Sequence, residues 1–286
     1  MKILEISYLY DEALARARGR PVDADGARRR LDEGSRSLAS LLKDTADGDG
    51  IARRVVPVDP RDLGLGAGGE APEQRPYAAV VGCSDARVPI ELIFNEGPND
   101  LFVVRVAGNG LGAEGLGSLK YAVDKLGESL KLIVVLGHSG CGAVSAAVDI
   151  MLQPHSYLAL AAKHTLRNIL DRLLVVVHAS AKRLAAVHGA DVARRAHYRE
   201  ALIETAVVSN AALSAFTADQ EFCKTSSEGL RAAYGVWLLE SREIWAPRAG
   251  SSECGGLALP PADGDEFDAF ADAVVRSARI EALLTT

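Results

Sequence analysis

Cysteine, methionine and aromatic residues are scarce in this chain, and the scarcity of cysteine excludes one class of protein at once. The 286 residues include 4 cysteines, 2 methionines and 5% aromatic residues. Cys83, Cys141, Cys223 and Cys254 are too few for the disulfide framework that stabilises small secreted domains. In a reducing compartment, such cysteines bind a metal, take part in catalysis or are simply buried.

The sequence also lacks an excess of positive charge and a long hydrophobic run. Its net charge of -6 offers no basic field to nucleic acid or anionic lipid. No apolar run approaches the roughly 18 residues that cross a bilayer. The N-terminal stretch contains Glu5, Asp11 and Glu12 and no small-residue cleavage site, which is not typical of a signal peptide. We therefore expect a cytoplasmic protein with no nucleic-acid or membrane partner.

What the chain does contain, between residues 77 and 136, is an alternation of short apolar runs and helical patterns. Apolar runs at 77–82, 101–108 and 132–136 end in small or polar residues, as buried parallel strands do. A helical pattern at 115–126 separates the second run from the third. Strands that alternate with helices indicate βαβ units and a parallel sheet.

Helical patterns flank this region on both sides. Further expected segments are a helix at 25–42 capped by Asp23 or Asp25, a Gly/Pro-rich loop at 64–76, mainly helical structure at 143–216, a late strand pair at 231–247 that turns near 240–242, and an amphipathic helix at 266–284. We expect one α/β domain over 1–286, with a mainly parallel central sheet flanked by helices. Its parts are an N-terminal helical arm (1–50), a core (51–150), a helical segment (151–217), and late strands with a C-terminal helical extension (218–286).

Three metal-binding side chains follow two of the predicted strands. His138 and Cys141 lie in LIVVLGHSGCGAV, and Cys83 follows the first strand in GCSDARVP. Ligands bind beyond the carboxyl ends of parallel strands, so neighbouring strands would bring the three together. Two thiolates and an imidazole suit zinc and leave a fourth position for water or substrate, as in catalytic sites. The alternative is a chance His-x-x-Cys with a merely buried cysteine.

Two opposite charges lie directly beside Cys83. Asp85 and Arg87 follow a buried strand, where charge is costly unless it is paired. A carboxylate fixed by an arginine has an oriented oxygen that can accept a hydrogen bond from zinc-bound water. Zinc lowers the pKa of such water toward about 7. The alternative interpretation is an ordinary surface salt bridge.

Together these residues form a pattern that resembles the β-class carbonic anhydrases. CSDARVP, followed after 55 residues by HSGCGAV, matches the C-x-D-x-R and H-x-x-C signatures of that family, with similarity over 31–144 and more weakly over 205–247. The resemblance implies Zn²⁺ held by Cys83, His138 and Cys141, and an Asp85–Arg87 dyad that orients zinc-bound hydroxide. It implies reversible hydration of CO2 to bicarbonate and a proton, in a homodimer or higher homo-oligomer.

The resemblance also implies a substrate pocket. Its positions are occupied here by Gln74, Phe102, Ala107 and Tyr121. In the family this pocket lies at a dimer interface, and Gln74 and Tyr121 are candidates to be supplied across it. Val80 replaces the tryptophan of a second, inhibitory bicarbonate site in regulated bacterial members, although Arg105 is kept, so we do not expect that regulatory site.

Three other functions remain open at this stage. GLGAEG at 110–115 is a G-x-G-x-x-G motif between a strand and a helix, which permits a zinc- and NAD-dependent dehydrogenase. Against it, the next strand ends at Leu136 without an acidic residue to bind a ribose hydroxyl. A non-catalytic zinc protein would not explain Asp85 and Arg87. Some relatives with the same zinc site hydrolyse carbonyl sulfide or carbon disulfide, and these enzymes share their motifs with the enzymes that hydrate CO2.

Overall fold

The computed structural model describes residues 3–47, 51–65, 71–155, 157, 164–224, 229–248, 250 and 255–285. At its centre is a five-stranded sheet with the order β4-β3-β5-β6-β7. Its strands are β3 (Ala78–Gly82), β4 (Leu101–Arg105), β5 (Leu132–His138), β6 (Arg231–Trp237) and β7 (Ile244–Trp245). All neighbours pair in parallel except β6 and β7, which are antiparallel. The α/β fold with a mainly parallel sheet is thus confirmed.

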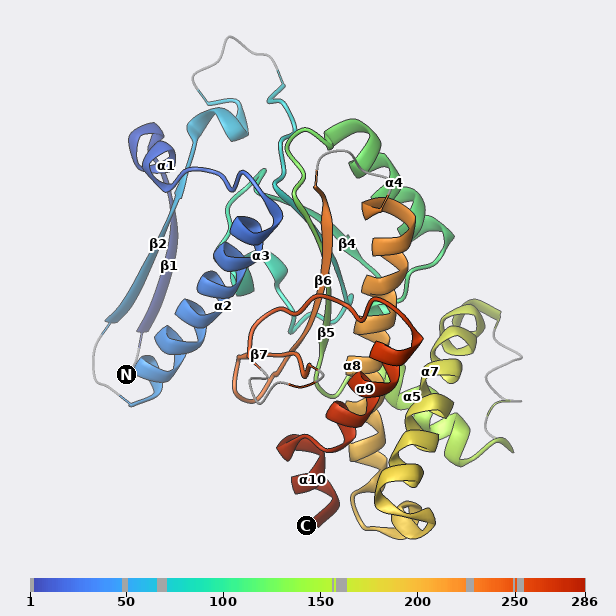
Figure 1. Cartoon of the computed structure of the whole chain (residues 1–286). Coiled ribbons are helices and arrows are strands. Elements are labelled where there is room, and N and C mark those ends of the chain that lie inside the picture. Colours follow the sequence, from blue (N-terminus) through green and yellow to red (C-terminus); the bar gives the residue numbers. More distant parts are fainter. Residues whose placement is uncertain are drawn as a thin grey trace.

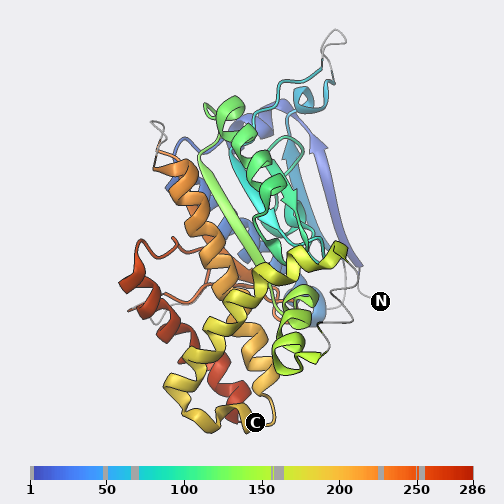
Figure 2. The same cartoon turned by 90° about the vertical axis from the view of Figure 1, so that its right-hand side faces the viewer.

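Helices cover both faces of this sheet, which explains why its strands are continuously apolar. In β3, Ala79 and Val81 face one hydrophobic cluster, and Ala78 and Val80 face the other. Figure 1 shows α2 and α8 on opposite sides of the sheet, and Figure 2 shows α7 crossing beside α8. The main helices are α2 (Ala24–Asp47), α3 (Ile90–Phe94), α4 (Ala113–Leu126), α5 (Gly142–Leu152), α7 (His164–His188) and α8 (Tyr198–Ala218).

The prediction that residues 1–50 form a helical arm is wrong for residues 3–10. These form β1 (Ile3–Tyr10), which pairs in parallel with β2 (Ile51–Val58) in a separate two-stranded sheet. Helix α1 (Glu12–Arg18) and α2 lie between the two strands in the chain. The strand ILEISYLY is rich in β-branched and aromatic residues, which favour strands. Its partner lies beyond α2 in the sequence, so no local pattern revealed the pairing.

The C-terminal extension is helical, but it is two helices where one was expected. Helix α9 (Gly264–Val275) ends at Arg276, and α10 (Ala278–Thr285) begins after Ser277. The Ser277 carbonyl accepts from the Glu281 backbone N–H, which starts the second helix. Short helical turns complete the described chain: η1 (Pro60–Leu63), η2 (Ala107–Asn109), η3 (Ala190–Arg194) and η4 (Asp219–Cys223). Cys254 lies outside the described residues.

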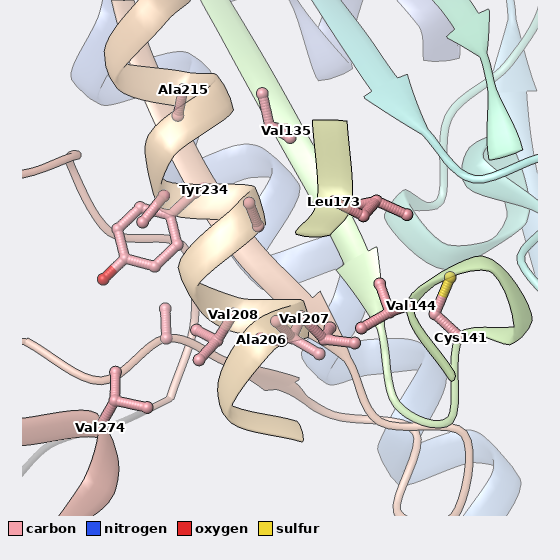
Figure 3. Packing of buried hydrophobic residues seen from close by; sticks show 14 of the residues in the cluster. Val135, Cys141, Val144, Leu173, Ala206, Val207, Val208, Ala215, Tyr234 and Val274 are labelled. Carbon is pink, nitrogen blue, oxygen red and sulfur yellow. The ribbon is translucent and has the colours of Figure 1, made fainter. Parts of the chain in front are cut away.

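Among the described residues, one helical stretch, Tyr198–Cys223, is long and apolar enough to span a bilayer, contrary to the expectation from the sequence. In this fold, 78% of its most apolar window is buried inside the protein. Figure 3 shows Ala206, Val207 and Ala215 of α8 packed among the other buried side chains of the cluster. A helix with so many buried apolar residues is expected in the interior of a protein of this size.

Candidate metal centre

The register of the sheet brings the three predicted metal ligands together. Strands β3 and β5 are neighbours, and Gly82 pairs with Leu136, so Cys83 and His138 lie just past the paired ends of adjacent strands. Gly140, at φ +60°, turns the chain sharply so that Cys141 precedes α5. Figure 3 shows Cys141 on this turn, with Val144 packed beside it. The ligand atoms of Cys83, His138 and Cys141 all lie within 4.8 Å of one another.

The donor geometry fits a tetrahedral zinc ion. The Cys83 and Cys141 sulfur atoms are 4.0 Å apart, close to the separation of about 3.8 Å that two Zn–S bonds of about 2.3 Å give at a tetrahedral angle. All three residues are buried. The His138 Nδ1 lies 3.0 Å from the Ser139 carbonyl oxygen, while its buried Nε2 has no hydrogen-bond partner among the described residues. An imidazole that binds a metal is expected to have one ring nitrogen hydrogen-bonded and the other free to coordinate the ion.

The two thiols affect each other's ionisation. The Cys141 thiol hydrogen-bonds Cys83 and holds the pKa of Cys83 well below its usual value, with help from His138 and from the backbone N–H groups of Asp85 and Gly108, although burial opposes this. The pKa of Cys141 is raised far above its usual value by that same hydrogen bond, by burial and by the Cys83 charge. The protein alone therefore favours one thiolate. A bound divalent cation would favour ionisation of the second thiol as well.

Asp85 is held firmly by Arg87. Its Oδ1 accepts from the Arg87 backbone N–H at 2.9 Å and from Nε at 3.0 Å, and its Oδ2 accepts from Nη2 at 2.7 Å. These hydrogen bonds hold the pKa of Asp85 well below its usual range. The same Oδ2 lies 3.8 Å from His138 Nε2. An ionised carboxylate therefore faces the ligand group, while its catalytic role remains a prediction.

Arg105 has a role near the site that the sequence analysis did not assign. Its Nε donates to the Cys83 carbonyl at 3.1 Å, and its Nη2 donates to the Asp85 carbonyl at 2.5 Å. It thereby fixes the segment that connects the first thiol to the carboxylate. A second unassigned residue, Asn210 of α8, donates to the Gly108 carbonyl at 2.9 Å. The resemblance links Arg105 only to a regulatory site, whereas its contacts here are with the Cys83 and Asp85 carbonyls.

The predicted pocket residues fall at two different places. Ala107 begins η2, next to Gly108, whose N–H lies 3.4 Å from the Cys83 sulfur. Phe102 pairs with Ala79, about 13 Å along the strand before Cys83. The Phe102 and Tyr121 rings are neighbours, with centroids 6.5 Å apart. Gln74 is exposed and precedes β3, at the opposite strand ends from the metal ligands of the same chain.

The glycine-rich turn at 110–115 has a packing explanation. Gly112 is the N-cap residue of α4. A Cβ atom at Gly112 would overlap the guanidinium of Arg172 from α7, so a larger residue here would require that arginine side chain to move. The arginine side chain lies over the turn that a dinucleotide phosphate would approach.

A buried Cys-His-Cys group beyond the carboxyl ends of the parallel strands, with an ion pair beside it, defines an α/β protein with a candidate metal-binding centre. Comparison with known families agrees with this class. The family model described as "Carbonic anhydrase" matches residues 78–223, which is half of the chain. The chain belongs to the carbonic anhydrase family, in its β class.

Individual relatives match over the same core. A protein named Carbonic anhydrase 2 from Mycobacterium tuberculosis is 51% identical over 85 residues, which are 30% of this chain and 38% of that protein. A Carbonic anhydrase from Pseudomonas aeruginosa is 46% identical over 82 residues, 27% of this chain and 36% of that protein. The chain thus spans little more than a third of the length of these relatives. A solved structure of a tetrameric β-carbonic anhydrase from Sordaria macrospora has 22% identity and a TM-score of 0.47, over 60% of this chain and 80% of that one.

Proposed function

We propose that this protein is a zinc-dependent carbonic anhydrase that catalyses reversible hydration of CO2 to bicarbonate and a proton. The observation that supports this most directly is the position of the Asp85 carboxylate, 3.8 Å from the partnerless Nε2 of His138. A structural zinc site would need four protein ligands and no oriented carboxylate. Membership of the carbonic anhydrase family supports the same reaction.

Each residue of the site has a distinct role in the proposed reaction. Cys83, His138 and Cys141 would hold the ion, and zinc, when bound, supplies a Lewis acid that makes hydroxide available at neutral pH. Asp85 would accept a hydrogen bond from the attacking nucleophile at its Oδ2, which orients the nucleophilic oxygen toward the carbon of CO2. Arg87 keeps both carboxylate oxygens in place. The uncharged Ala107, beside the Cys83 thiolate, is compatible with a nonpolar substrate.

We also propose that the working form is a homodimer or a higher homo-oligomer in the cytoplasm. Gln74 precedes β3, and Phe102 of β4 contacts Tyr121 of α4, so all three lie toward the strand ends opposite the metal ligands of their own chain, and a second copy would have to supply them. Strand β4 is an edge of the sheet, and the Tyr121 side chain beside it is 52% exposed. Unpaired edges and exposed aromatic side chains are typical of subunit interfaces. A reducing compartment would keep the two close thiols available to a metal.

Replacing Tyr121 with aspartate is expected to dissociate the oligomer. A charge placed among apolar side chains at an interface would have to be desolvated, which costs several kcal/mol without a partner. Light scattering after size-exclusion chromatography should therefore show Tyr121→Asp at the mass of one chain. Val175→Asp, on the exposed surface of α7, is the matched control and should keep the wild-type mass. Equal masses for the two variants would contradict this interface.

The reaction itself is tested by stopped-flow CO2 hydration with purified protein that contains about one zinc per chain. We expect a rate that is first order in enzyme and lost when a chelator removes the metal. Hydrolysis of carbonyl sulfide and carbon disulfide is measured in parallel, because related zinc sites act on them. Consumption of either without CO2 hydration would replace the proposed substrate. Well under one zinc per chain in freshly purified protein would contradict the metal assignment.

A further inference from the structure

An ion-pair network connects the C-terminal helix to the segment between two metal ligands. We call residues 138–141, from His138 to Cys141, the metal loop. Arg279 of α10 donates from Nε and Nη2 to Glu204 Oε2 of α8, at 3.0 and 2.7 Å. Its Nη1 lies 2.6 Å from Oε1 of Glu240, in the turn after β6. One guanidinium therefore bridges two carboxylates from different parts of the fold.

Each of these carboxylates uses its other oxygen to bind the metal loop. Glu204 Oε1 accepts from the Gly140 backbone N–H at 2.9 Å. Glu240 Oε2 accepts from the Ser139 hydroxyl at 2.8 Å. The same hydroxyl accepts from the Leu239 backbone N–H at 2.9 Å, so its hydrogen bonds define its direction. Both residues between His138 and Cys141 are thus held from outside the loop.

The side chains of this network are largely shielded from solvent, so their hydrogen bonds can fix the groups that they connect. Glu204 and Ser139 are buried, and the Arg279 side chain is only 25% exposed. The Arg279 guanidinium also lies over the Trp245 ring, 5.6 Å from its centroid. Ion pairs with both partners on the surface contribute little, whereas oriented pairs in partly buried sites fix the groups they bind. The loop has further backbone contacts, since the Ser139 N–H donates to the Trp237 carbonyl at 3.0 Å, but the two carboxylates connect it to α10.

We propose that Arg279 is a positioning residue for the metal centre. By holding Glu204 and Glu240 at once, it fixes the metal loop so that the His138 nitrogen and the Cys141 sulfur keep their separation before a metal binds. The C-terminal helix α10 would thus support metal affinity, although it supplies no ligand. This inference rests on the proposed metal site and does not depend on which substrate is used.

The test compares Arg279→Gln with a variant that removes a similar ion pair elsewhere. Arg183 of α7 binds Asp272 at 3.1 Å and also Asp268, both on α9, and none of these contacts reaches the metal loop. Zinc affinity is measured by competition with a chromophoric chelator, and the unfolding midpoint of the metal-free protein is measured alongside. We expect Arg279→Gln to weaken zinc binding about tenfold or more, as changes to groups that orient ligands do. Arg183→Gln should change zinc affinity less than about twofold, even where both variants lose similar stability.

A second variant keeps the test decisive if Arg279→Gln folds poorly. Glu240 is half-exposed, so Glu240→Gln preserves the fold while it weakens the hold on Ser139, and it should reduce zinc affinity in the same direction. The cobalt-substituted protein adds a readout of thiolate geometry, which should shift in Glu240→Gln and stay unchanged in Arg183→Gln. Zinc affinities that match the wild type in both network variants would overturn the inference.

The outcomes also separate this inference from the proposed reaction. A wild-type protein that binds zinc without hydrating CO2 would reject the reaction alone. Unchanged zinc affinity in the network variants of an active enzyme would reject the positioning role alone. A wild-type chain that binds no zinc would overturn both.

Discussion

Replacement of Cys83 with serine is expected to cost nearly all bound zinc and, with it, CO2 hydration. A serine hydroxyl stays protonated at neutral pH and is a poor ligand, so only His138 and Cys141 would remain. Loss of groups that merely orient ligands reduces metal affinity about 10–100-fold, and loss of a ligand should exceed that. Metal analysis after dialysis should show far less than one zinc per chain, and stopped-flow hydration should approach the uncatalysed rate.

Cys223 provides the matched control for this substitution. It is a buried thiol in η4, burial raises its pKa to about 12, and it is not part of the metal-binding group. Cys223→Ser should therefore keep about one zinc per chain and most of the hydration rate, although it loses some stability. Full zinc content in Cys83→Ser would show that the ion binds elsewhere. Similar losses in both variants would indicate a general folding defect.

The sequence allowed the sheet and its metal ligands to be predicted for a specific physical reason. Buried parallel strands are continuous apolar runs, and the groups that follow them must meet at one edge when the strands are neighbours. Both conditions hold for Cys83 and His138, since β3 pairs directly with β5. The structure also shows the Asp85–Arg87 ion pair that the two-residue spacing suggested.

Features that depend on distant pairing were not predictable in the same way. The pairing of β1 with β2 spans an intervening helix of 24 residues, so the sequence pattern of residues 3–10 alone does not indicate it. The roles of Glu204 and Arg279 depend on where α8 and α10 meet the metal loop, and neither residue belongs to a motif. Arg105 was noticed, but its two carbonyl contacts depend on the pairing of β4 with β3. Tertiary contacts of this kind leave no local periodicity in a single sequence.

Replacement of Asp85 with asparagine is expected to reduce CO2 hydration about 100-fold or more while zinc is retained. Removing one preorganised group that hydrogen-bonds the reacting oxygen typically costs about 10²–10³-fold in rate, and the neutral amide lacks the charge that orients the nucleophile. Zinc should remain because Cys83, His138 and Cys141 are unchanged. The Arg87 side chain is 61% exposed, so the loss of its partner leaves no buried charge, and the fold should be preserved. Zinc content, unfolding midpoint and hydration rate are measured on the same preparation.

A second Asp-x-Arg pair in this chain supplies an unusually close control. Asp59 accepts from the Arg61 backbone N–H at 2.9 Å, from Nε at 3.0 Å and from Nη2 at 2.6 Å, as Asp85 does from Arg87. Arg61 lowers the pKa of Asp59 to about 2. Asp59→Asn removes the same kind of contact, but at the start of η1, so its hydration rate should stay within about twofold of wild type. Equal losses in the two variants would mean that Asp85 acts only on stability.

The pH dependence follows from the sign of the Asp85 shift. The pKa of Asp85 is lowered, so the stabilising contact with Arg87 is fully present above the ordinary aspartate pKa and is lost only as pH falls through the lower folded value. Asp85 therefore stays ionised from pH 6.5 to 9, and the wild-type rate should rise over this range with the ionisation of the attacking water. Asp85→Asn should keep the shape of that profile at a lower rate. If the wild type instead loses activity abruptly near pH 6.5 with zinc retained, and Asp85→Asn does not, the aspartate must leave Arg87 and block the metal.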